Sequence, residues 1–519
     1  NAGVWRYHPV RHEFEVFAHG TSNPWGLDYD QHGEWFVTAC VIPHLYHIVP
    51  GGRYHRQAGQ HFNAHTYEDI KTIADHAHYA GNPRPDVTFD KTTGAGVMNN
   101  DTNALGGGHA HCGLAIYQSS LFPPTYRNQL LFGNLHGHRL VANYTDPHAS
   151  TYIGKHAADF LRANDMHFIP VTQRVGPDGA LYVSDWSDQQ ICHRGSGAVE
   201  HWDRSNGRLY RISYDGWKPW KGDLAKASDE ALAKLAVQTE NEWESRMARR
   251  VLMEKFVTAL TAAGGKFTAE NAAKGMASFE KGLNYAQAMF ETAGSTTERI
   301  RALWMVASIL PSLPGIEHLA ESPEIDSRIR GQMIRLMALP HFHATLDPKA
   351  ADRLPLMADP NKLMSAAKVE QSPIVRRELA SALQRLPIAQ RKDLAAALLK
   401  HGEDKDDPMI PLLIWYGIEP LVAADPAVGM QLAKVSKMPK VTQFIYRRLT
   451  STPEGWEAMF VLADHTEELG TKTLYVESLV QARKQGTKMG ERGENWTGSV
   501  ALLRNGETPR LKQLVYELS

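Results

Sequence analysis

The sequence has 519 residues, more than one hydrophobic core usually organises, so we expect at least two domains. Its hydrophobic content of 43% and charged content of 22% are typical of a globular chain and argue against intrinsic disorder. The net charge of −1 provides no electrostatic basis for binding nucleic acid, and no apolar run reaches the roughly 20 residues that cross a bilayer. We therefore expect neither a nucleic-acid partner nor a transmembrane segment.

The first residue is Asn1 and not Met, so we expect either a removed targeting segment or a longer gene product. The three cysteines are Cys40, Cys112 and Cys192, and none belongs to a CxxCH motif. Covalent attachment of a c-type haem to this chain is therefore not expected. Cys40 and Cys192 each follow a predicted strand, and we expect a disulfide between them if the protein is exported.

Residues 1–215 contain short runs typical of β-strands, separated by turn residues. The segment NPWGLDYDQHGEWFVTAC (23–40) has the same layout as IPVTQRVGPDGALYVSDW (169–186), with Gly33 matching Gly179. A looser third copy begins at residue 109 and places Gly113 opposite Gly26. Such units predict about three blades of a β-propeller, and a β-sandwich is the alternative. A propeller usually has about four to eight blades, so we expect a missing N-terminal portion or a separate chain to complete it.

Residues 223–519 form the second predicted domain, after a junction rich in Gly, Pro and Trp at 214–224. Four segments begin with a Ser, Thr or Pro cap and continue with apolar residues three and four apart: 295–310, 322–339, 371–386 and 438–449. This recurrence predicts a HEAT-like α-solenoid, and a non-repetitive helical domain is the alternative. The expected fold class is thus multidomain β plus α.

Twenty of the 25 histidines lie at or before His201, and several stand near predicted strand ends. The motif GGGHAHCGLAIYQ (106–118) contains His109 and His111, NLHGHR contains His136 and His138, and SDWSDQQ contains Asp185 and Asp188. If the strands converge on a propeller axis, these groups are candidate ligands of a transition metal: His109, His111, His136, His138 and Asp188. The alternative roles are structural, with the histidines bonded to carbonyl groups and the aspartates capping turns.

Several segments resemble known proteins. NPWGLDYDQHGEWFVT and GPDGALYVSDW are similar to blades of soluble PQQ-dependent sugar dehydrogenases. The order of the domains, with LGGGHAHCGLAIY and WYGIEPLVAADP, more closely resembles bacterial propeller–HEAT proteins regarded as membrane-bound dehydrogenases. The resemblance implies PQQ and Ca²⁺ as cofactors, a cytochrome c as partner and a periplasmic or otherwise exported location. The sequence departs from the pattern of the sugar dehydrogenases at Ser22, where those proteins have an arginine.

The candidate cofactor contacts that follow from this resemblance are Asn23, Trp25, Pro43, Asn134 and Arg174. The function it implies is a periplasmic dehydrogenase that oxidises a sugar or alcohol and passes electrons to a separate cytochrome. In that hypothesis His109 or His111 is the catalytic base and Asp185 orients it. The alternative is a non-catalytic scaffold that binds a protein or carbohydrate partner.

Overall fold

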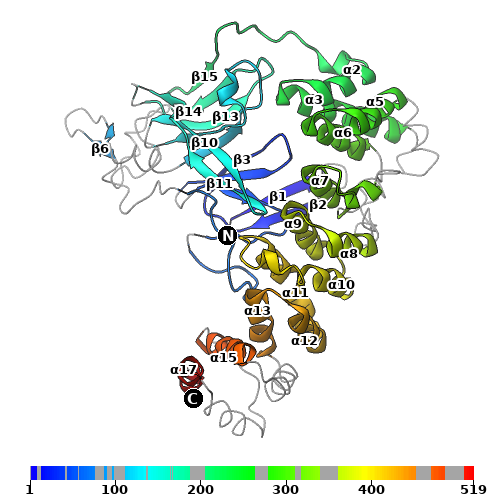
Figure 1. Ribbon diagram of the computed structural model, residues 1–519. Helices are drawn as coiled ribbons and strands as arrows, with labels where there is room; N and C mark the ends of the chain where they lie inside the picture. Colours follow the sequence, from blue (N-terminus) through cyan, green and yellow to red (C-terminus); the bar gives the residue numbers. More distant parts are fainter. Residues whose placement is uncertain are drawn as a thin grey trace. The chain divides into compact units, whose positions relative to one another are not determined.

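In the computed structural model, the chain divides into two compact units, which are described separately (Figure 1). The sheet unit comprises Asn1–Gly59 and Lys71–Met357, and the helix unit comprises Gln60–Ile70 and Ala358–Ser519. The structure describes residues 2–8, 13–40, 44–56, 58–75, 87–89, 96–98, 111–135, 138–163, 165, 167–186, 205–262, 279–309, 317–338, 360–451, 469–484 and 508–518.

The strands of the sheet unit form small antiparallel sheets from segments close in sequence. The first three-stranded sheet has the order β3 (Pro24–Tyr29), β4 (Trp35–Ala39), β5 (Tyr46–Ile48). A larger sheet has the order β11 (Thr151–His156), β10 (Arg139–His148), β9 (Leu130–Asn134), β8 (His111–Ile116), and β12 (Leu161–Arg162) also pairs with β10. A third has the order β13 (Pro170–Val175), β14 (Leu181–Asp185), β15 (Arg208–Ile212). Two hairpins pair β1 (Gly3–His8) with β2 (Glu13–His19) and β6 (Val87–Phe89) with β7 (Gly96–Met98).

Three of these sheets share a local irregularity in their first strand. In β3 the register shifts between Pro24 and Gly26, and in β13 it shifts between Pro170 and Thr172. In β8 the shift lies between Cys112 and Ala115. A bulge of this kind bends the strand and increases its twist. The turns that follow β3 and β13 each contain a glycine in the left-handed region, with φ of 80° at Gly33 and 76° at Gly179. The repeated sequence layout is therefore repeated in the geometry.

The first strands of the three sheets meet at glycines. A Cβ on Gly26 would lie 2.1 Å from the carbonyl carbon of Gly113, and one on Gly113 would lie 2.8 Å from the Val171 carbonyl oxygen. Both distances are shorter than the van der Waals contact distance of a Cβ atom, so only glycine allows the two backbones to approach so closely. The backbones of β3, β8 and β13 consequently lie against one another.

The sheet that contains β8 and β9 is covered on both faces. Leu114 and Phe132 belong to one apolar cluster, whereas Ala115 and Leu131 belong to another. Neighbouring residues of a strand point to opposite faces, so both faces of this sheet are packed. This double burial explains the nearly continuous apolar runs at 112–117 and 130–135.

Helices of the sheet unit follow the last strand in the chain: α2 (Asp229–Gln238), α3 (Glu242–Ala262), α5 (Glu280–Thr292), α6 (Thr296–Ile309) and α7 (Ser327–Met337). The Ser228 hydroxyl caps α2 by accepting a hydrogen bond from the Ala231 N–H. From α3, Arg246 donates to Asp28 Oδ1 at 2.7 Å and to the Tyr29 carbonyl at 2.8 Å. These bonds attach α3 to β3.

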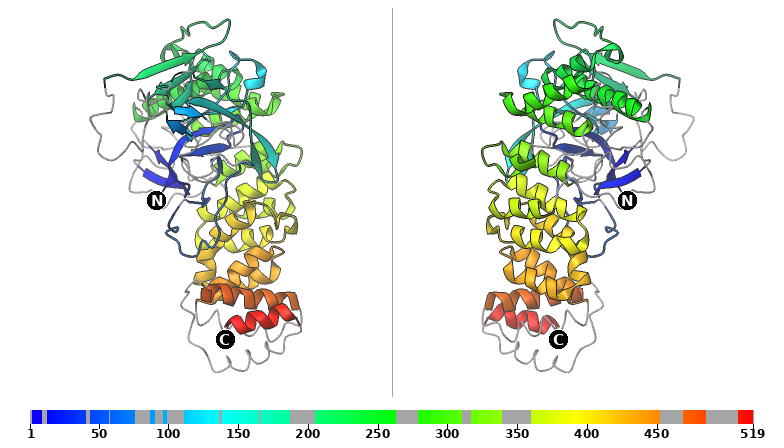
Figure 2. Two further views of the ribbon diagram at one scale, coloured as in Figure 1. Left: turned by 90° about the vertical axis from the view of Figure 1, so that its left-hand side faces the viewer. Right: turned by 90° about the vertical axis from the view of Figure 1, so that its right-hand side faces the viewer.

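The helix unit contains helices that follow one another in layers (Figure 2): α8 (Pro360–Val369), α9 (Pro373–Ala382), α10 (Arg391–Leu398), α11 (Ile410–Ala424), α12 (Pro426–Val435), α13 (Pro439–Leu449), α15 (Leu469–Lys484) and α17 (Pro509–Leu518). Six of them, α8, α9, α11, α12, α13 and α17, have proline in the first turn, where its missing N–H costs no helical hydrogen bond. Among the described helices, none has the length and apolar character that crossing a bilayer requires.

The predicted boundary between 1–215 and 223–519 marks the change of secondary structure, because the last strand ends at Ile212 and the first helical turn begins at Leu224. It is not the boundary of the compact units, which lies between Met357 and Ala358. Helices α2 to α7 belong with the sheets, since α3 is bonded to β3 through Arg246. The structure therefore shows a mixed β and α chain with several small antiparallel sheets, and both the partial propeller and the HEAT-like solenoid stay predictions.

Candidate functional site

One end of the three neighbouring sheets carries most of the predicted site residues. At this end Pro24 pairs with Ala39, His111 with Asn134, and Pro170 with Asp185. An apolar cluster joins the three sheets there, and its buried members are Cys40, Cys112, Leu135 and Ile169. We refer to this region, where β3, β8 and β13 begin, as the strand-start end.

The structure describes seven of the predicted site residues, namely Asn23, Trp25, His111, Asn134, His138, Arg174 and Asp185. The others lie outside the described residues, namely Pro43, His109, His136 and Asp188. Arg174 lies away from the strand-start end, opposite Tyr182 in the β13–β14 ladder. Its guanidinium donates to the Leu114 and Gln173 carbonyl oxygens at 2.8 and 2.9 Å, so it connects strands.

His111 lies at the start of β8 and is fully buried. Its ring lies 4.3 Å from the ring of His44 and 5.1 Å from that of Phe132, measured between centroids. His44 Nε2 in turn lies 3.2 Å from the side-chain nitrogen of Asn143. With the Asn143 amide in this orientation, it donates and the His44 ring accepts, which requires a neutral imidazole. Sequence inspection did not single out His44 or Asn143.

Asp185 is held by two structural contacts. One carboxylate oxygen accepts from the Ile169 N–H at 2.6 Å, and the other accepts from Arg208 at 2.6 Å. Arg208 also pairs with Asp165 at 2.8 Å. Burial raises the pKa of Asp185, while the Ile169 N–H and Arg208 act in the opposite direction. Both oxygens thus connect β14 to β15 and to the residue before β13.

His138 also has a structural contact, because its Nδ1 lies 3.0 Å from the Phe168 carbonyl oxygen. The side chain is buried, and burial lowers the pKa of the ring. A neutral ring that donates from Nδ1 keeps Nε2 as an acceptor. Within the described part of the chain, no group of three His, Cys, Asp or Glu side chains is positioned to hold a metal ion.

Asn23, Trp25 and Trp186 are exposed at the strand-start end. Both indoles have a relative exposure of 47%. Asn23 has a positive φ of 43°, and its carbonyl accepts from the Cys40 N–H at 3.1 Å. Asparagine tolerates this backbone conformation better than most residues. These exposed side chains are available to contact a ligand at this end.

The sulfur atoms of Cys40 and Cys112 lie 3.7 Å apart in the strand-start cluster. Both side chains are buried. The hydrogen bond with Cys112 lowers the pKa of Cys40. Cys192 lies outside the described residues, so its predicted disulfide with Cys40 stays a prediction.

A buried polar network in the sheet unit was not predicted. His47 Nδ1 lies 2.8 Å from the Thr151 hydroxyl, and His47 Nε2 lies 2.8 Å from Glu34 Oε2. Arg335 of α7 reaches the same Glu34 oxygen at 3.2 Å. The only sequence signal was the repeated histidine in PHLYH (43–47), since the partners are distant in the chain. This network connects β5, β11 and α7.

PQQ and Ca²⁺ stay predictions, because the candidate cofactor contact Pro43 lies outside the described residues. PQQ carries carboxylates, which need cationic or N–H donors, and Ca²⁺ needs several oxygen ligands. At the strand-start end Arg208 is already paired with Asp185 and Asp165, and Ser22 stands in place of an arginine. Among the described groups there is also no cluster of acidic or imidazole ligands for a cation. No catalytic step is derived through either group.

A family described as a domain of unknown function, DUF7133, matches residues 1–216. No curated protein matches the chain.

Among solved structures, the chain is similar to a putative oxidoreductase (glucose dehydrogenase) from Thermus thermophilus, with 21% identity, 38% of this chain and 47% of that chain covered, and a TM-score of 0.23. A second glucose dehydrogenase has 20% identity, the same coverage and a TM-score of 0.23. A mutant of Kap121p has 12% identity, covers 56% of this chain and 36% of its own, and has a TM-score of 0.27. The chain thus spans less than half of the length of these structures.

Proposed function

We propose that this chain is a dehydrogenase-like protein that binds a neutral sugar or alcohol at the strand-start end of its sheets. The observation that carries the proposal is the exposure of Trp25, Trp186 and Asn23 at this end. An indole presents a flat apolar face, on which the C–H face of a sugar ring packs. The Asn23 amide supplies both a donor and an acceptor for sugar hydroxyl groups.

In this proposal the three sheets are blades of a propeller whose remaining blades lie elsewhere in the protein. The recurring bulge, the repeated Gly33 and Gly179 turns and the contact between Gly26 and Gly113 support this arrangement. Convergence of equivalent strand ends is the property that collects residues from distant segments into one site. The proposal includes export to the periplasm.

Oxidation of an alcohol removes the hydroxyl proton and a hydride from the same carbon. Of the described imidazoles at the strand-start end, we assign the uptake of the proton to His111, whose ring is buried and lies 4.3 Å from the ring of His44. The hydride needs an acceptor that protein side chains do not provide. We assign that role to a two-electron acceptor of the quinone type from outside the described residues, which would then pass one electron to each of two cytochrome c molecules.

A non-catalytic carbohydrate-binding scaffold is the second candidate. The observation that favours it is the structural use of the predicted orienting acid, because both Asp185 oxygens bond to Ile169 and Arg208. A catalytic carboxylate would instead be expected to hold the base. The same surface would then serve recognition alone.

Sugar titrations of wild type and of a Trp25→Ala/Trp186→Ala double variant test the proposal, with a dye-linked oxidation assay on the same samples. We expect the double variant to lose binding of a neutral sugar from a mono- and disaccharide panel. Trp5→Ala is the matched control, because Trp5 is 61% exposed on the β1–β2 hairpin. Binding with dye reduction supports the dehydrogenase, binding without it supports the scaffold, and equal binding by all three proteins contradicts both.

A further inference from the structure

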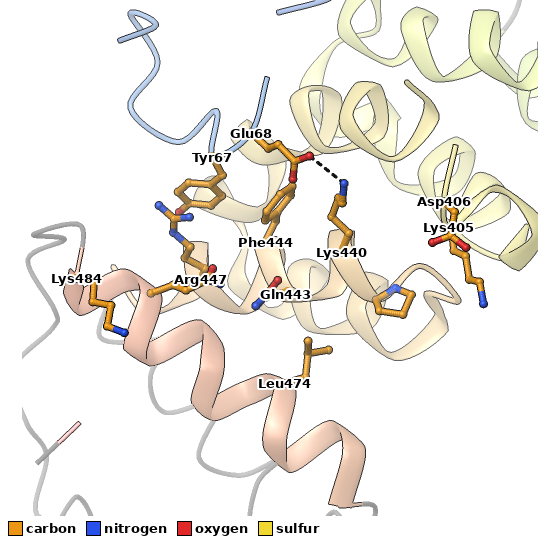
Figure 3. A pocket seen from close by; sticks show the side chains of 12 residues that line it. Tyr67, Glu68, Lys405, Asp406, Lys440, Gln443, Phe444, Arg447, Leu474 and Lys484 are labelled. Carbon is orange, nitrogen blue, oxygen red and sulfur yellow. Dashed lines mark hydrogen bonds and ion pairs between the residues drawn. The ribbon is translucent and has the colours of Figure 1, made fainter. Parts of the chain in front are cut away.

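A pocket of about 720 Å³ lies in the helix unit, between α13, α15 and the segment at Tyr67 and Glu68 (Figure 3). We call it the α13 pocket. Its walls include the apolar side chains of Phe444 and Leu474 and the charged side chains of Lys440 and Arg447. This volume is in the range of small-molecule sites, which span about 300–1,000 Å³.

Arg447 stacks on the ring of Tyr67. Its guanidinium carbon lies 3.5 Å from the centre of the Tyr67 ring, which also contacts the Trp415 ring at 5.3 Å, inclined by only 14°, and the Phe444 ring at 5.6 Å. The segment that carries Tyr67 is fixed on both sides, because Trp415 donates to the His65 carbonyl at 2.8 Å and Tyr416 donates to the Glu68 carbonyl at 2.7 Å. The stack therefore holds the guanidinium in a defined position.

No carboxylate pairs with Arg447 among the described residues. Arg447 has a relative exposure of only 4%, and its Nε is buried with no hydrogen-bond partner. The nearby carboxylates are used elsewhere, since Glu419 accepts from Arg448 at 2.8 Å and Glu68 accepts from Lys440 at 2.9 Å. Arg447 is thus a buried donor beside a pocket, and the described part of the chain supplies no carboxylate for its charge.

A buried, unpaired guanidinium is costly. Burial lowers the pKa of Arg447, but an arginine stays protonated in proteins, so it cannot escape the cost by losing its proton. The rim adds positive charge, because four basic and two acidic side chains line the pocket. An anion in the pocket would supply the missing acceptor, and stacking on Tyr67 leaves the edge of the guanidinium plane available for it.

We propose that the α13 pocket binds a small oxyanion, whose carboxylate or phosphate oxygens accept hydrogen bonds from Arg447. Phe444 and Leu474 provide an apolar wall for the body of an organic ligand, and the Gln443 and Gln481 amides provide further polar contacts. The ligand class is thus a small organic acid or phosphate compound. This site differs in residues and in chemistry from the strand-start end, where the described charges are paired and the exposed groups are two indoles and an amide.

Calorimetric titration at constant ionic strength tests this assignment with inorganic phosphate, citrate and glucuronate. We expect at least one probe to bind the wild type, and Arg447→Met to weaken that binding at least about tenfold, since hydrogen bonds to charged groups are strong. Lys434→Met is the matched control, because Lys434 is exposed on α12 and does not line the pocket. It removes the same charge and should change affinity less than about twofold.

The probes also distinguish the two ligand chemistries. Binding of phosphate alone assigns a phosphate compound, and binding of citrate or glucuronate alone assigns a carboxylic acid. If Arg447→Met loses its helical circular dichroism, Arg447→Lys decides, because it keeps the charge but not the planar fork, and should weaken binding. Failure of all three probes to bind, or equal affinity in wild type and the folded Arg447 variant, overturns the proposal.

Discussion

Both compact units contain buried guanidinium groups that pair with carboxylates, and the helix unit also contains Arg447, for which no described carboxylate is a partner. In the sheet unit Arg139 lies 2.6 Å from Asp159, and Arg301 lies 2.6 Å from Glu242. In the helix unit Arg376 is likewise paired with Asp404 through two bonds of 2.6 Å, whereas Arg447 faces an aromatic ring and a pocket. Paired charges hold elements together, and an unpaired charge beside a pocket indicates a place for a ligand.

A similar contrast separates the strand-start end from the α13 pocket. At the strand-start end the described charges are satisfied, and the exposed groups are two indoles and an amide. At the α13 pocket the charged groups of the lining are mainly basic. We therefore expect substitutions in the sheets to change stability most, and substitutions at Arg447 to change binding most.

The largest expected effect is at the contact between β3 and β8. Gly26→Ala places a carbon 2.1 Å from the Gly113 backbone, so the strands must separate or the unit must fail to fold. We expect a loss of more than about 4 kcal/mol in the free energy of unfolding, or no folded protein. Gly207→Ala is the control, since a Cβ there meets nothing within 4 Å. Chemical denaturation of both variants measures the difference, and near-equal stabilities would contradict the backbone contact.

The next effect compares two arginines within the helix unit. Arg376→Met leaves Asp404 buried and uncompensated, so we expect a loss of about 3–5 kcal/mol. Arg447→Met removes a buried unpaired charge, which destabilises the fold, and a cation–π contact with Tyr67, which stabilises it. Because the two contributions oppose each other, the free energy of unfolding should change by no more than about 1 kcal/mol. Thermal and chemical unfolding of both variants checks this. Equal losses would show that Arg447 has a structural partner after all.

A smaller, pH-dependent effect is expected at Asp30 in the turn after β3. Burial, followed by the charge of Glu34, raises the pKa of Asp30 to about 7. Since the native state then holds a proton that the unfolded state releases near pH 4, the stability from this group is present below about pH 4 and is lost as the pH rises through about 7.

Asp30→Asn keeps an oxygen for the His32 and Glu34 N–H groups, both at 2.9 Å. We expect this variant to be more stable than wild type by about 2–4 kcal/mol above pH 7, with the difference vanishing near pH 4. Unfolding curves recorded from pH 4 to 9 test it. A constant difference across this range would mean that Asp30 does not titrate there.

The smallest effect concerns the cysteines and involves no change in stability. Cys40 and Cys112 lie 3.7 Å apart and are both buried, so we expect both to resist alkylation in the native protein. After unfolding without reductant, two free thiols would both react, whereas a Cys40–Cys192 disulfide would leave only Cys112 of this pair reactive. Peptide mapping without reductant also shows what Cys40 is bonded to. A Cys40–Cys192 disulfide would confirm the sequence prediction. The Cys112 thiol would then lie beside a disulfide rather than beside a second thiol.

Local patterns allowed much of the secondary structure to be predicted. The segments 295–310 and 438–449 correspond to α6 at Thr296–Ile309 and α13 at Pro439–Leu449, because caps and apolar spacing are local signals. The alignment of Gly113 with Gly26 also corresponds to a physical contact, since both glycines serve the same close approach of strands.

The site was harder to predict, because its contacts join distant segments. Nothing near Asp185 in the sequence indicates that Arg208 and Ile169 occupy both of its oxygens. Tyr67 and Arg447 come from segments that are far apart in the chain. The composition of residues 60–70 does not indicate that they belong to the helix unit. His44 was missed for the same reason, since its partners His111 and Asn143 come from the β8–β11 sheet.

The most direct test of the account is a crossed titration. Wild type, Trp25→Ala/Trp186→Ala and Arg447→Met are each titrated calorimetrically with the neutral sugars and with citrate. We predict that the tryptophan variant loses only sugar binding and that Arg447→Met loses only citrate binding. Loss of both ligands in both variants, or of neither ligand in either, would contradict two chemically separate binding regions.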